Sequence, residues 1–378
     1  MGGRRACRQA DGIYLDNGAT TLRKPMAVYT AVSDGMKNCG SVGRGSHKWA
    51  MQAAQTVHNC RKEAGLLFDA ESEQVVFTQN ATHGLNIALA SLCREGTRVV
   101  ISGYEHNAVL RPLVASGAKI QVVGRKLFDP QGALEEFEKA IREGAEVAVC
   151  NCCSNVFGYV LPYGDLGELC RKREIPLILD ASQAAGVLPI SLRESGAAFI
   201  AMPGHKGLYG PQGTGLLLCA AEGRPLLYGG TGGNSRSREM PEFLPDRLEA
   251  GTHNVWGIAG LLEGLRYVRK RGTGNIFAKE QELMKLLCKE LEGTKGLRLY
   301  KGRGQIGVLS LRIEGRDCGE LAQALADRGI AVRAGLHCAP LAHESAGTAP
   351  MGTLRLSLSD FTEPRELQGF GSVWKKLF

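Results

Sequence analysis

The chain has 378 residues, of which 44% are hydrophobic and 22% are charged, a composition typical of globular proteins that excludes collagen, coiled-coil and disordered chains. Its net charge of +8 is spread along the chain apart from short basic patches at residues 4–8 and 266–271, which lack interleaved aromatic residues, so nucleic acid binding is not expected. No apolar run approaches the ~20 residues of a membrane span, and no apolar stretch follows the basic N-terminus. We therefore expect a cytoplasmic protein without a membrane segment.

Twelve cysteines are scattered through the chain without regular spacing, which in a chain of this length is typical of reduced thiols rather than of a disulfide framework. Cys150, Cys152 and Cys153 contain one C-x-x-C pair, but no second pair or histidine lies at the spacing of a zinc ligand. We interpret this cluster as buried cysteines of a strand and expect no metal; a metal site is the alternative.

Between residues 75 and 220, short β-branched segments alternate with stretches of helical periodicity, which predicts a mostly parallel α/β sheet with crossover helices. The predicted strands are Val75–Thr78, Arg98–Ser102, Ile120–Val123, Glu146–Cys150, Leu177–Asp180 and Ala198–Met202. The predicted helices include Asn80–Leu92, Ala133–Arg142 and Gly164–Glu174. Because the Gly-rich return at residues 207–215 is too short for a crossover, we expect the next strand, Leu216–Ala221, to be antiparallel.

The pattern changes after a polar stretch at residues 229–245. Long helical segments follow at Val255–Arg271 and Ile276–Leu291, and then come Gly307–Ile313, a helix at Cys318–Arg328 and a strand at Leu354–Leu358. This change predicts a smaller C-terminal α+β domain. We expect residues 21–254 to form the large domain and 255–378 the small one, with residues 1–20 packing on the small domain.

Two residues that follow predicted strands stand out chemically. In open α/β sheets ligands bind beyond the carboxyl ends of the strands, and parallel strands place these ends at one edge. Asp180 ends one strand, and Lys206 follows the next strand along the chain. Taken alone, the two side chains can simply form an ion pair.

A third feature is the turn at residues 79–84, which follows the strand Val75–Thr78. Its free backbone N–H groups and the Thr82 hydroxyl suit a phosphate, although Thr82 can also be only a helix cap. A pyridine cofactor bound as a Schiff base needs a lysine for its aldehyde, an acid for its ring nitrogen and a helix N-terminus for its phosphate. The chain offers all three.

Short motifs along nearly the whole chain share their order and spacing with a known family. They are Tyr14–Thr21, Gly43–His47, Thr78–Thr82, Glu105–Asn107, Asp180–Gln183, Gly204–Pro211, Ala250–Asn254, Arg333–Pro340 and Leu354–Ser357. Together they resemble the class V aminotransferase group of fold-type I pyridoxal 5′-phosphate (PLP) enzymes, and within it the cysteine desulfurases related to selenocysteine lyase. The resemblance implies a large, mostly parallel sheet of the seven-stranded type, a smaller α+β domain, and a homodimer with shared active sites.

The resemblance also implies roles around the cofactor. Lys206 would be the Schiff-base lysine, Asp180 the partner of the pyridinium nitrogen and Gln183 the contact of the ring hydroxyl. His106 would stack on the ring and act as an acid or base, although it can also be a loop histidine that caps the next helix. The other implied cofactor residues are Ala81, Thr82, His205, Asn155 and Thr231, the last from a Gly-rich loop, Gly229–Gly233, that would reach the neighbouring subunit. Pro203 replaces a residue that often carries a hydroxyl in relatives, which removes one phosphate contact.

Two further residues are implied to act on the substrate. Arg355 would bind the α-carboxylate together with Asn155, although an edge-strand surface arginine would look the same. Cys338 would be the nucleophile, although a free cysteine is usually a small buried hydrophobe. A normal thiol needs a positive neighbour to become thiolate at neutral pH, and His337 and Arg333 are the candidates.

The function that these roles imply is a PLP-dependent cysteine desulfurase. L-cysteine would be converted to L-alanine, with a persulfide on Cys338 that passes to an acceptor, which can be a protein. The alternatives are a lyase acting on L-selenocysteine, and a β-eliminase or epimerase in which Cys338 is a bystander. A non-catalytic scaffold is another alternative, but the intact set of Lys206, Asp180 and Arg355 argues against it.

Overall fold

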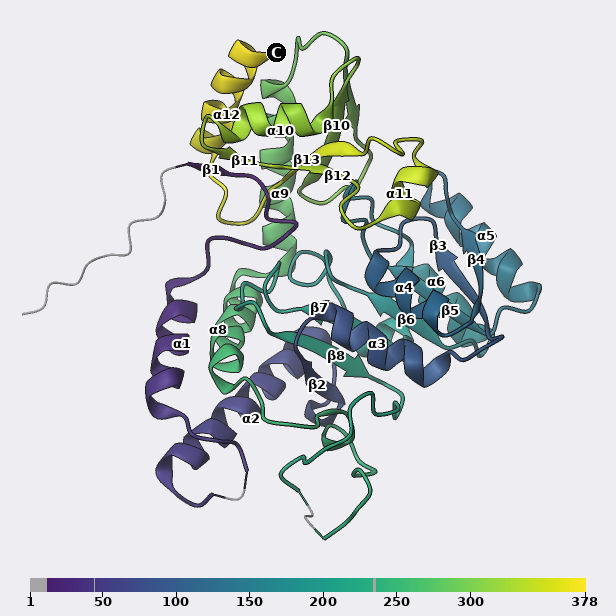
Figure 1. The fold of residues 1–378 in the computed structure, drawn as a ribbon, viewed down its shortest axis with the longest axis vertical. Helices are drawn as coiled ribbons and strands as arrows, with labels where there is room; N and C mark the ends of the chain where they lie inside the picture. Colours follow the sequence, from purple (N-terminus) through teal and green to yellow (C-terminus); the bar gives the residue numbers. More distant parts are fainter. Residues whose placement is uncertain (1–11, 44, 234–235) are drawn as a thin grey trace, which may run out of the picture.

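The computed structural model describes residues 12–43, 45–233 and 236–378, which contain a large sheet and a smaller one (Figure 1). The large sheet has seven strands in the order β2-β8-β7-β6-β5-β3-β4. Their bounds are β2 Val75–Thr78, β3 Arg98–Ser102, β4 Lys119–Val123, β5 Val147–Asn151, β6 Leu177–Asp180, β7 Phe199–Pro203 and β8 Gly215–Cys219. Each predicted strand is present, with ends that differ by two residues at most.

The five consecutive strands β4, β3, β5, β6 and β7 are parallel, whereas β8 is antiparallel to both β7 and β2. The prediction that the strand after the Gly-rich return is antiparallel is therefore confirmed. The sheet is mostly parallel, as predicted, and the carboxyl ends of β5, β6 and β7 lie at one edge.

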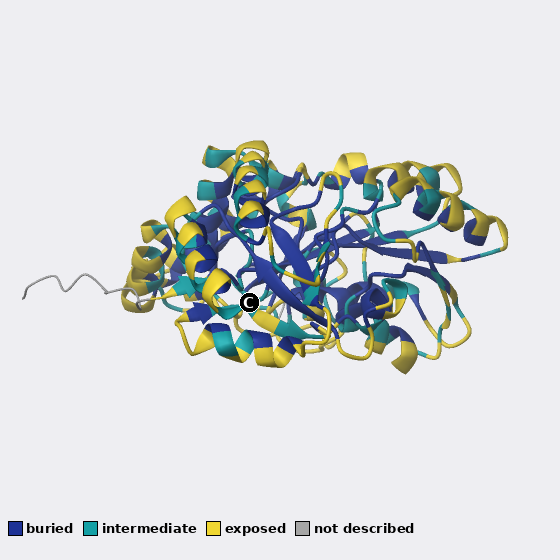
Figure 2. Ribbon diagram, turned by 90° about the horizontal axis from the view of Figure 1, so that it is seen from above, coloured by how far each residue is buried: buried dark blue, intermediate teal, exposed yellow. Residues whose placement is uncertain are grey.

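Helices cover both faces of the large sheet, as its fully buried strands require. One face packs against α3 (Ala81–Leu92) and α4 (Asn107–Ala115), and the other against α2 (Lys48–Phe68), α5 (Pro130–Arg142), α6 (Tyr163–Lys172) and α8 (Val255–Arg271). Figure 2 shows the buried strands in the middle and the exposed helix surfaces outside. The result is a three-layer α/β/α domain.

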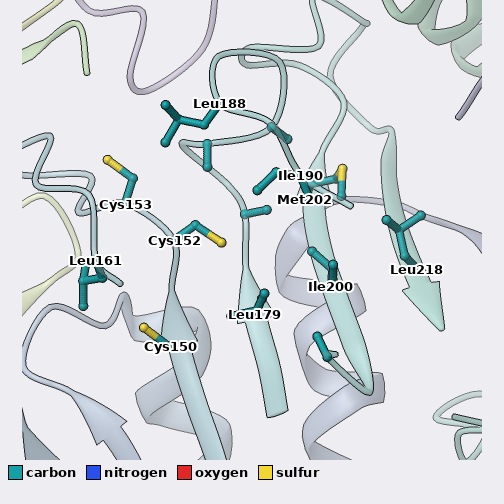
Figure 3. Close-up of a cluster of buried hydrophobic side chains, with 14 of the residues drawn as sticks. Cys150, Cys152, Cys153, Leu161, Leu179, Leu188, Ile190, Ile200, Met202 and Leu218 are labelled. Carbon is teal, nitrogen blue, oxygen red and sulfur yellow. The ribbon is translucent and has the colours of Figure 1, made fainter. Parts of the chain in front are cut away.

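The cysteine cluster lies inside this domain. Cys150, Cys152 and Cys153 are buried among aliphatic side chains such as Leu179 and Ile200 (Figure 3). Burial raises the pKa of all three thiols well above the usual range. These cysteines therefore behave as small core residues, as the strand interpretation predicts.

The small domain is built on an antiparallel sheet in the order β12-β13-β10-β9. Its elements are β9 Leu297–Tyr300, β10 Val308–Ile313, β12 Arg333–Gly335 and β13 Thr353–Ser357, with α9 Thr273–Glu290, α10 Cys318–Ala326, α11 Pro340–Ser345 and α12 Pro364–Leu377. Figure 1 shows this domain above the large sheet.

The N-terminal segment lies on the small domain from the first residues that the structure describes. The two-residue strand β1 (Ile13–Tyr14) pairs in parallel with β11 (Ile330–Ala331), and Leu15 joins the core around Trp374. Residues 1–11 of the predicted 1–20 segment, together with the basic patch at residues 4–8, lie outside the described residues. For residues 12–20 we propose that the segment packs on the small domain, as the sequence predicts.

The helix α8 belongs to the core of the large domain. It packs against α2 and against α1 (Met26–Asn38), and its residues Ile258, Leu261 and Leu265 join the large-sheet core. The core of the small domain contains α9 from Leu283 onward. We therefore propose a boundary at the α8–α9 junction, where Gly272 has a φ of +80°, instead of at residue 255.

Candidate active site

An open cavity of about 520 Å³ lies at the carboxyl ends of β5, β6 and β7. Most of the residues implied to hold the cofactor line it, namely Lys206, Asp180, Gln183, His106, Ala81, Thr82, His205 and Asn155. Thr231 is the exception: within the described residues its loop lies beside residue 43 and does not line this cavity. The fold thus brings together groups from five separate segments of the chain.

Lys206 lies in a tightly packed loop after β7. Thr21 holds this loop by donating from Oγ1 to the carbonyl oxygens of His205 (3.0 Å) and Lys206 (3.2 Å). Only glycine fits at position 204, because a Cβ atom there would lie 2.1 Å from Thr214 Oγ1. Burial lowers the pKa of Lys206 to about 8, with Asp180 opposing the shift and Arg355 adding to it. Its amine therefore loses its proton more easily than an ordinary lysine.

Asp180 and Gln183 are held by backbone groups on the cavity wall. Asp180 ends β6, and its Oδ1 accepts from the Ser182 N–H at 2.9 Å. Gln183 Nε2 donates to the Gly18 carbonyl at 2.9 Å, which ties the N-terminal segment to the cavity. A carboxylate is thus available on the wall that Lys206 also lines.

His106 is the N-cap of α4. Its Nδ1 accepts from the Ala108 N–H at 3.0 Å, so the proton of the neutral ring is on Nε2. Burial lowers the pKa of His106, with Asp180 opposing the shift and Lys206 adding to it. The capping role that the sequence left open is observed, and it makes Nε2 a hydrogen-bond donor on the cavity wall.

The N-terminus of α3 forms the end of the cavity opposite the sheet. Its cap is Asn80, whose Oδ1 accepts from the His83 N–H at 2.9 Å, so the alternative that Thr82 is the cap is wrong. The backbone N–H groups of Ala81 and Thr82 belong to the first helical turn, where they have no intrahelical partner. His205 lies nearby, and burial lowers its pKa to about 4, with Lys206 and Lys24 adding to the shift. This end of the cavity suits an anion.

Arg355 comes from the small domain and is only 2% exposed, so the alternative of a surface arginine is wrong. Its Nη2 pairs with Asp16 Oδ1 at 2.7 Å, and its Nη1 donates to the Asn155 carbonyl at 2.9 Å. Arg333 lies directly opposite on the neighbouring strand, so both side chains lie on one face of the sheet. A second guanidinium group thus lies beside the Arg355–Asp16 ion pair on the same face of the sheet.

Cys338 is exposed, whereas the other cysteines in the described part of the chain are buried or half-buried. The sequence-based expectation that His337 stabilises the thiolate of Cys338 is wrong. Burial lowers the pKa of His337 to about 2, with Arg355 and His343 adding to the shift, and its Nε2 donates to the Thr353 carbonyl at 3.1 Å. A neutral ring cannot favour a thiolate. Of the two candidates, only the exposed Arg333 remains.

The geometry agrees with comparisons to known proteins. The family model of the class V aminotransferases matches residues 13–370 of the chain. The chain belongs to this family. This class V aminotransferase is 30% identical to a probable cysteine desulfurase of Methanothermobacter thermautotrophicus over 97% of this chain and 95% of that protein. It is 31% identical to a cysteine desulfurase of Escherichia coli over 88% of this chain and 86% of that one.

A solved cysteine desulfurase structure from Thermococcus onnurineus has the same fold. It superposes with a TM-score of 0.89 at 30% identity, covering 97% of this chain and 94% of that one. The family and the fold class predicted from the sequence are therefore confirmed.

Sequence reasoning about this class V aminotransferase missed several residues of the site. Asp16 is in a quoted motif but was given no role, because its partner Arg355 is 339 positions away. Asn151 ends β5 and lines the cavity, so the strand-end rule that found Asp180 would also have found it. Asn107 is a third case, since its backbone N–H donates to the Cys338 carbonyl at 2.8 Å.

Proposed function

We propose that this class V aminotransferase is a cysteine desulfurase that converts L-cysteine to L-alanine and leaves a persulfide on Cys338. One observation carries the proposal: the exposed Cys338 is tied by its own carbonyl to Asn107, the residue next to His106 on the Lys206 cavity. The backbone of Cys338 is therefore fixed next to a cavity that is lined by an amine, a carboxylate and an imidazole. The similarity to named cysteine desulfurases supports the same conclusion.

The donor set of the cavity fits PLP. The cofactor would be held by Lys206 at its aldehyde, by Asp180 at its ring nitrogen and by the N-terminus of α3 at its phosphate. Gln183, His106 and His205 complete the set, and Pro203 lines the same cavity without contributing a donor. Bound PLP supplies an aldehyde for the substrate amine and a ring that accepts electrons from Cα.

The residues of the chain orient the substrate and move its protons. Arg355 retains N–H donors beyond the two that Asp16 and Asn155 use, so it can take the α-carboxylate. Lys206, with its pKa near 8, is suited to remove and return the proton at Cα. His106 carries its proton on Nε2 and is suited to donate it to the reacting group.

Sulfur transfer belongs to Cys338. Its thiolate attacks the substrate sulfur, an S–S bond forms, and the Cβ–S bond breaks with its electron pair left on Cβ. A proton taken up at Cβ then completes L-alanine, while the terminal sulfur of the Cys338 persulfide remains for transfer to an acceptor, which can be a protein.

The test is Cys338→Ala, assayed for alanine and persulfide on the same sample. The variant keeps Lys206, Asp180 and Arg355, so L-cysteine should still bind while both products fall by orders of magnitude. With L-selenocysteine the loss should be smaller, because the selenol is ionised and selenium leaves without a protein nucleophile. Normal turnover of cysteine by Cys338→Ala would overturn the proposal in favour of an eliminase or lyase.

We also propose a homodimer with shared active sites. A single chain exposes large apolar side chains on α1, at the start of α2, on α8 and in the segment at residues 226–243, namely Met26, Tyr29, Met36, Trp49, Met51, Leu227, Tyr228, Phe243 and Trp256. These segments lie together at the lower part of Figure 1, and α1 packs on α8. Such an extended apolar face is typical of an interface. Thr231 lies in the same region, so we assign its cofactor contact to the partner's site.

A cytoplasmic location is part of the proposal. The cysteines in the part of the chain that the structure describes are all free thiols, which is typical of a reducing compartment. None of the helices in that part combines the length and the apolar character needed to cross a bilayer.

A further inference from the structure

Cys338 is part of a tight turn whose backbone is unusual for its sequence. Ala339 N–H donates to the Leu336 carbonyl at 2.9 Å, and the two residues between them, His337 and Cys338, have φ values of +49° and +56°. These are the features of a type I′ turn, which strongly favours Asn-Gly because both central residues are left-handed. His and Cys carry a Cβ atom that disfavours this conformation. The turn therefore needs support from outside itself.

The support comes from the large domain at both left-handed residues. Asn155 Nδ2 donates to the His337 carbonyl at 2.8 Å, and the Asn107 N–H donates to the Cys338 carbonyl at 2.8 Å. The His337 ring is held from the other side, because its Nε2 donates to Thr353 of the small domain. Consecutive peptide groups of the turn are thus fixed between the two domains.

Asn155 also contacts the carboxylate-binding end of the site. Its own carbonyl accepts from Arg355 Nη1 at 2.9 Å, and its Oδ1 is buried without a partner among the described residues. One residue therefore connects the guanidinium group that takes the substrate carboxylate with the turn that carries the nucleophile. The connection is short and buried, because it runs through a single asparagine.

We propose that the Asn155 side chain and the Asn107 N–H are positioning groups that clamp the Cys338 turn in its left-handed conformation. Without the clamp the two residues relax to negative φ, and the Cys338 side chain points in another direction relative to Arg355 and Lys206. The role of Cys338 as the nucleophile rests on the proposed function. The clamp itself is a statement about the backbone and can be tested separately.

Two variants remove one hydrogen bond each. Asn155→Ala removes the side-chain donor and leaves the carbonyl that Arg355 contacts. Asn107→Pro removes the N–H together with the Asn107 side chain, and it suits the site because Asn107 is the first residue of α4 and His106 before it has φ −77° and ψ 157°. The matched control is Ser345→Ala, which removes a 2.9 Å hydrogen bond from α11 to the Gly103 carbonyl, away from the turn.

The first measurement is hydrogen exchange of the full-length protein, followed by mass spectrometry of peptides covering residues 333–345. Exchange around residues 336–339 should rise on the order of fivefold in both variants, the factor expected for one lost hydrogen bond, and should stay unchanged in Ser345→Ala. The second is steady-state kinetics with L-cysteine. Asn107→Pro should lower kcat by a similar factor or more at unchanged KM, because Asn107 has no contact with the carboxylate site.

Each result decides the proposal. Unchanged exchange at residues 336–339 in both variants would show that the turn holds itself, and the clamp would be wrong even if activity fell. A loss of activity in Asn155→Ala without faster exchange would place Asn155 at the substrate carboxylate alone. If Asn155→Ala does not fold, Asn107→Pro decides. Hydrogen exchange needs no turnover, so it tests the clamp even in a protein that does not act on cysteine. The clamp and the proposed desulfurase function can therefore fail independently.

Discussion

Lys206 has a pKa near 8 because burial disfavours its charged form, and this single residue governs how the cofactor would be taken up. Only the neutral amine attacks an aldehyde. For the protein stripped of PLP, the rate of Schiff-base formation on adding PLP should rise with pH up to about 8 and then level off, whereas an ordinary lysine would give a rate that rises to about pH 10.5. Stopped-flow absorbance measures this profile.

The control for this profile is Lys206→Ala, which should fold normally and form no Schiff base at any pH. A rate that still climbs steeply between pH 9 and 10, or borohydride labelling of a different lysine, would show that another amine takes the cofactor.

At Arg355 the effect of the planar guanidinium group can be measured separately from the effect of its positive charge. Arg355→Lys keeps a positive charge but loses the planar fork, so kcat/KM should fall by ~1.5–3 kcal/mol, about 10- to 150-fold, and equally for L-cysteine and L-selenocysteine. Parallel kinetics with both substrates measure the effect. A loss confined to one substrate would mean that Arg355 acts on the sulfur or selenium atom and not on the shared carboxylate.

At this scale the sequence predicted which residues line the cavity but not their electrostatics. The strand-end rule found Asp180 and Lys206 because strand ends are visible as the end of an apolar run. The neutrality of His337 was missed because it follows from burial, which depends on packing between distant segments. The turn at Cys338 was missed because His-Cys has none of the Asn or Gly that signals a left-handed turn.

At the scale of elements, the parallel strands were the most predictable part, since β-branched runs buried on both faces have a strong pattern. The helix α2 shows the opposite case. Its buried face includes Ala50, Ala53, Cys60 and Ala64, small residues that give only a weak hydrophobic period. Its place against α8 depends on close packing of these residues, which a hydrophobicity pattern does not reveal. The same close packing explains why the boundary that we propose differs from the one predicted at residue 255. Because α8 packs on α2, we assign α8 to the large domain.

A buried ionic group joins three of these elements. Glu249, which precedes α8, pairs with Arg61 of α2 at 2.8 Å, accepts from Phe77 N–H of β2 at 2.5 Å and contacts His253 at 2.6 Å. Burial acts to raise the pKa of Glu249, but His253 and Arg61 outweigh it and the net shift is downward. The stability that this group provides is present above the unfolded pKa of about 4.5 and is lost as the pH falls below it.

Glu249→Gln should therefore lower the free energy of unfolding at pH 7 by about 3 kcal/mol, because Arg61 is left buried without its counter-charge. Urea denaturation at pH 7 measures the loss, and the difference from wild type should shrink as the pH is lowered below 4.5. Glu146→Gln is the control: Glu146 pairs with Arg98 at 3.5 Å on the exposed surface, and its loss should change stability by less than about 0.5 kcal/mol. Equal effects of the two variants would contradict the role of burial.

At the scale of the whole molecule, the exposed apolar face predicts a dimer that a single charge can break. Trp256 is 45% exposed on α8 beside Gly35 of α1, and it is one of the apolar residues of this face. Trp256→Glu should convert a dimer into a monomer at micromolar concentration in sedimentation experiments, and it should weaken PLP binding if Thr231 acts in the partner's site. Val114→Glu is the control, because Val114 is 64% exposed on α4 outside this face. A wild-type monomer with full activity at high dilution would refute the dimer.

The ion pair between Asp16 and Arg355 has a consequence for biosynthesis. Its partners are separated by 339 positions, so Asp16 leaves the ribosome long before Arg355 has been made. At ~5–20 residues per second the interval is on the order of tens of seconds. Nascent chains that end before Arg355 can form the central parallel strands, but β1 and β13 have no partner or do not yet exist. The Asp16–Arg355 pair is therefore formed only near the end of translation, and incomplete chains lack the arginine that we propose binds the substrate.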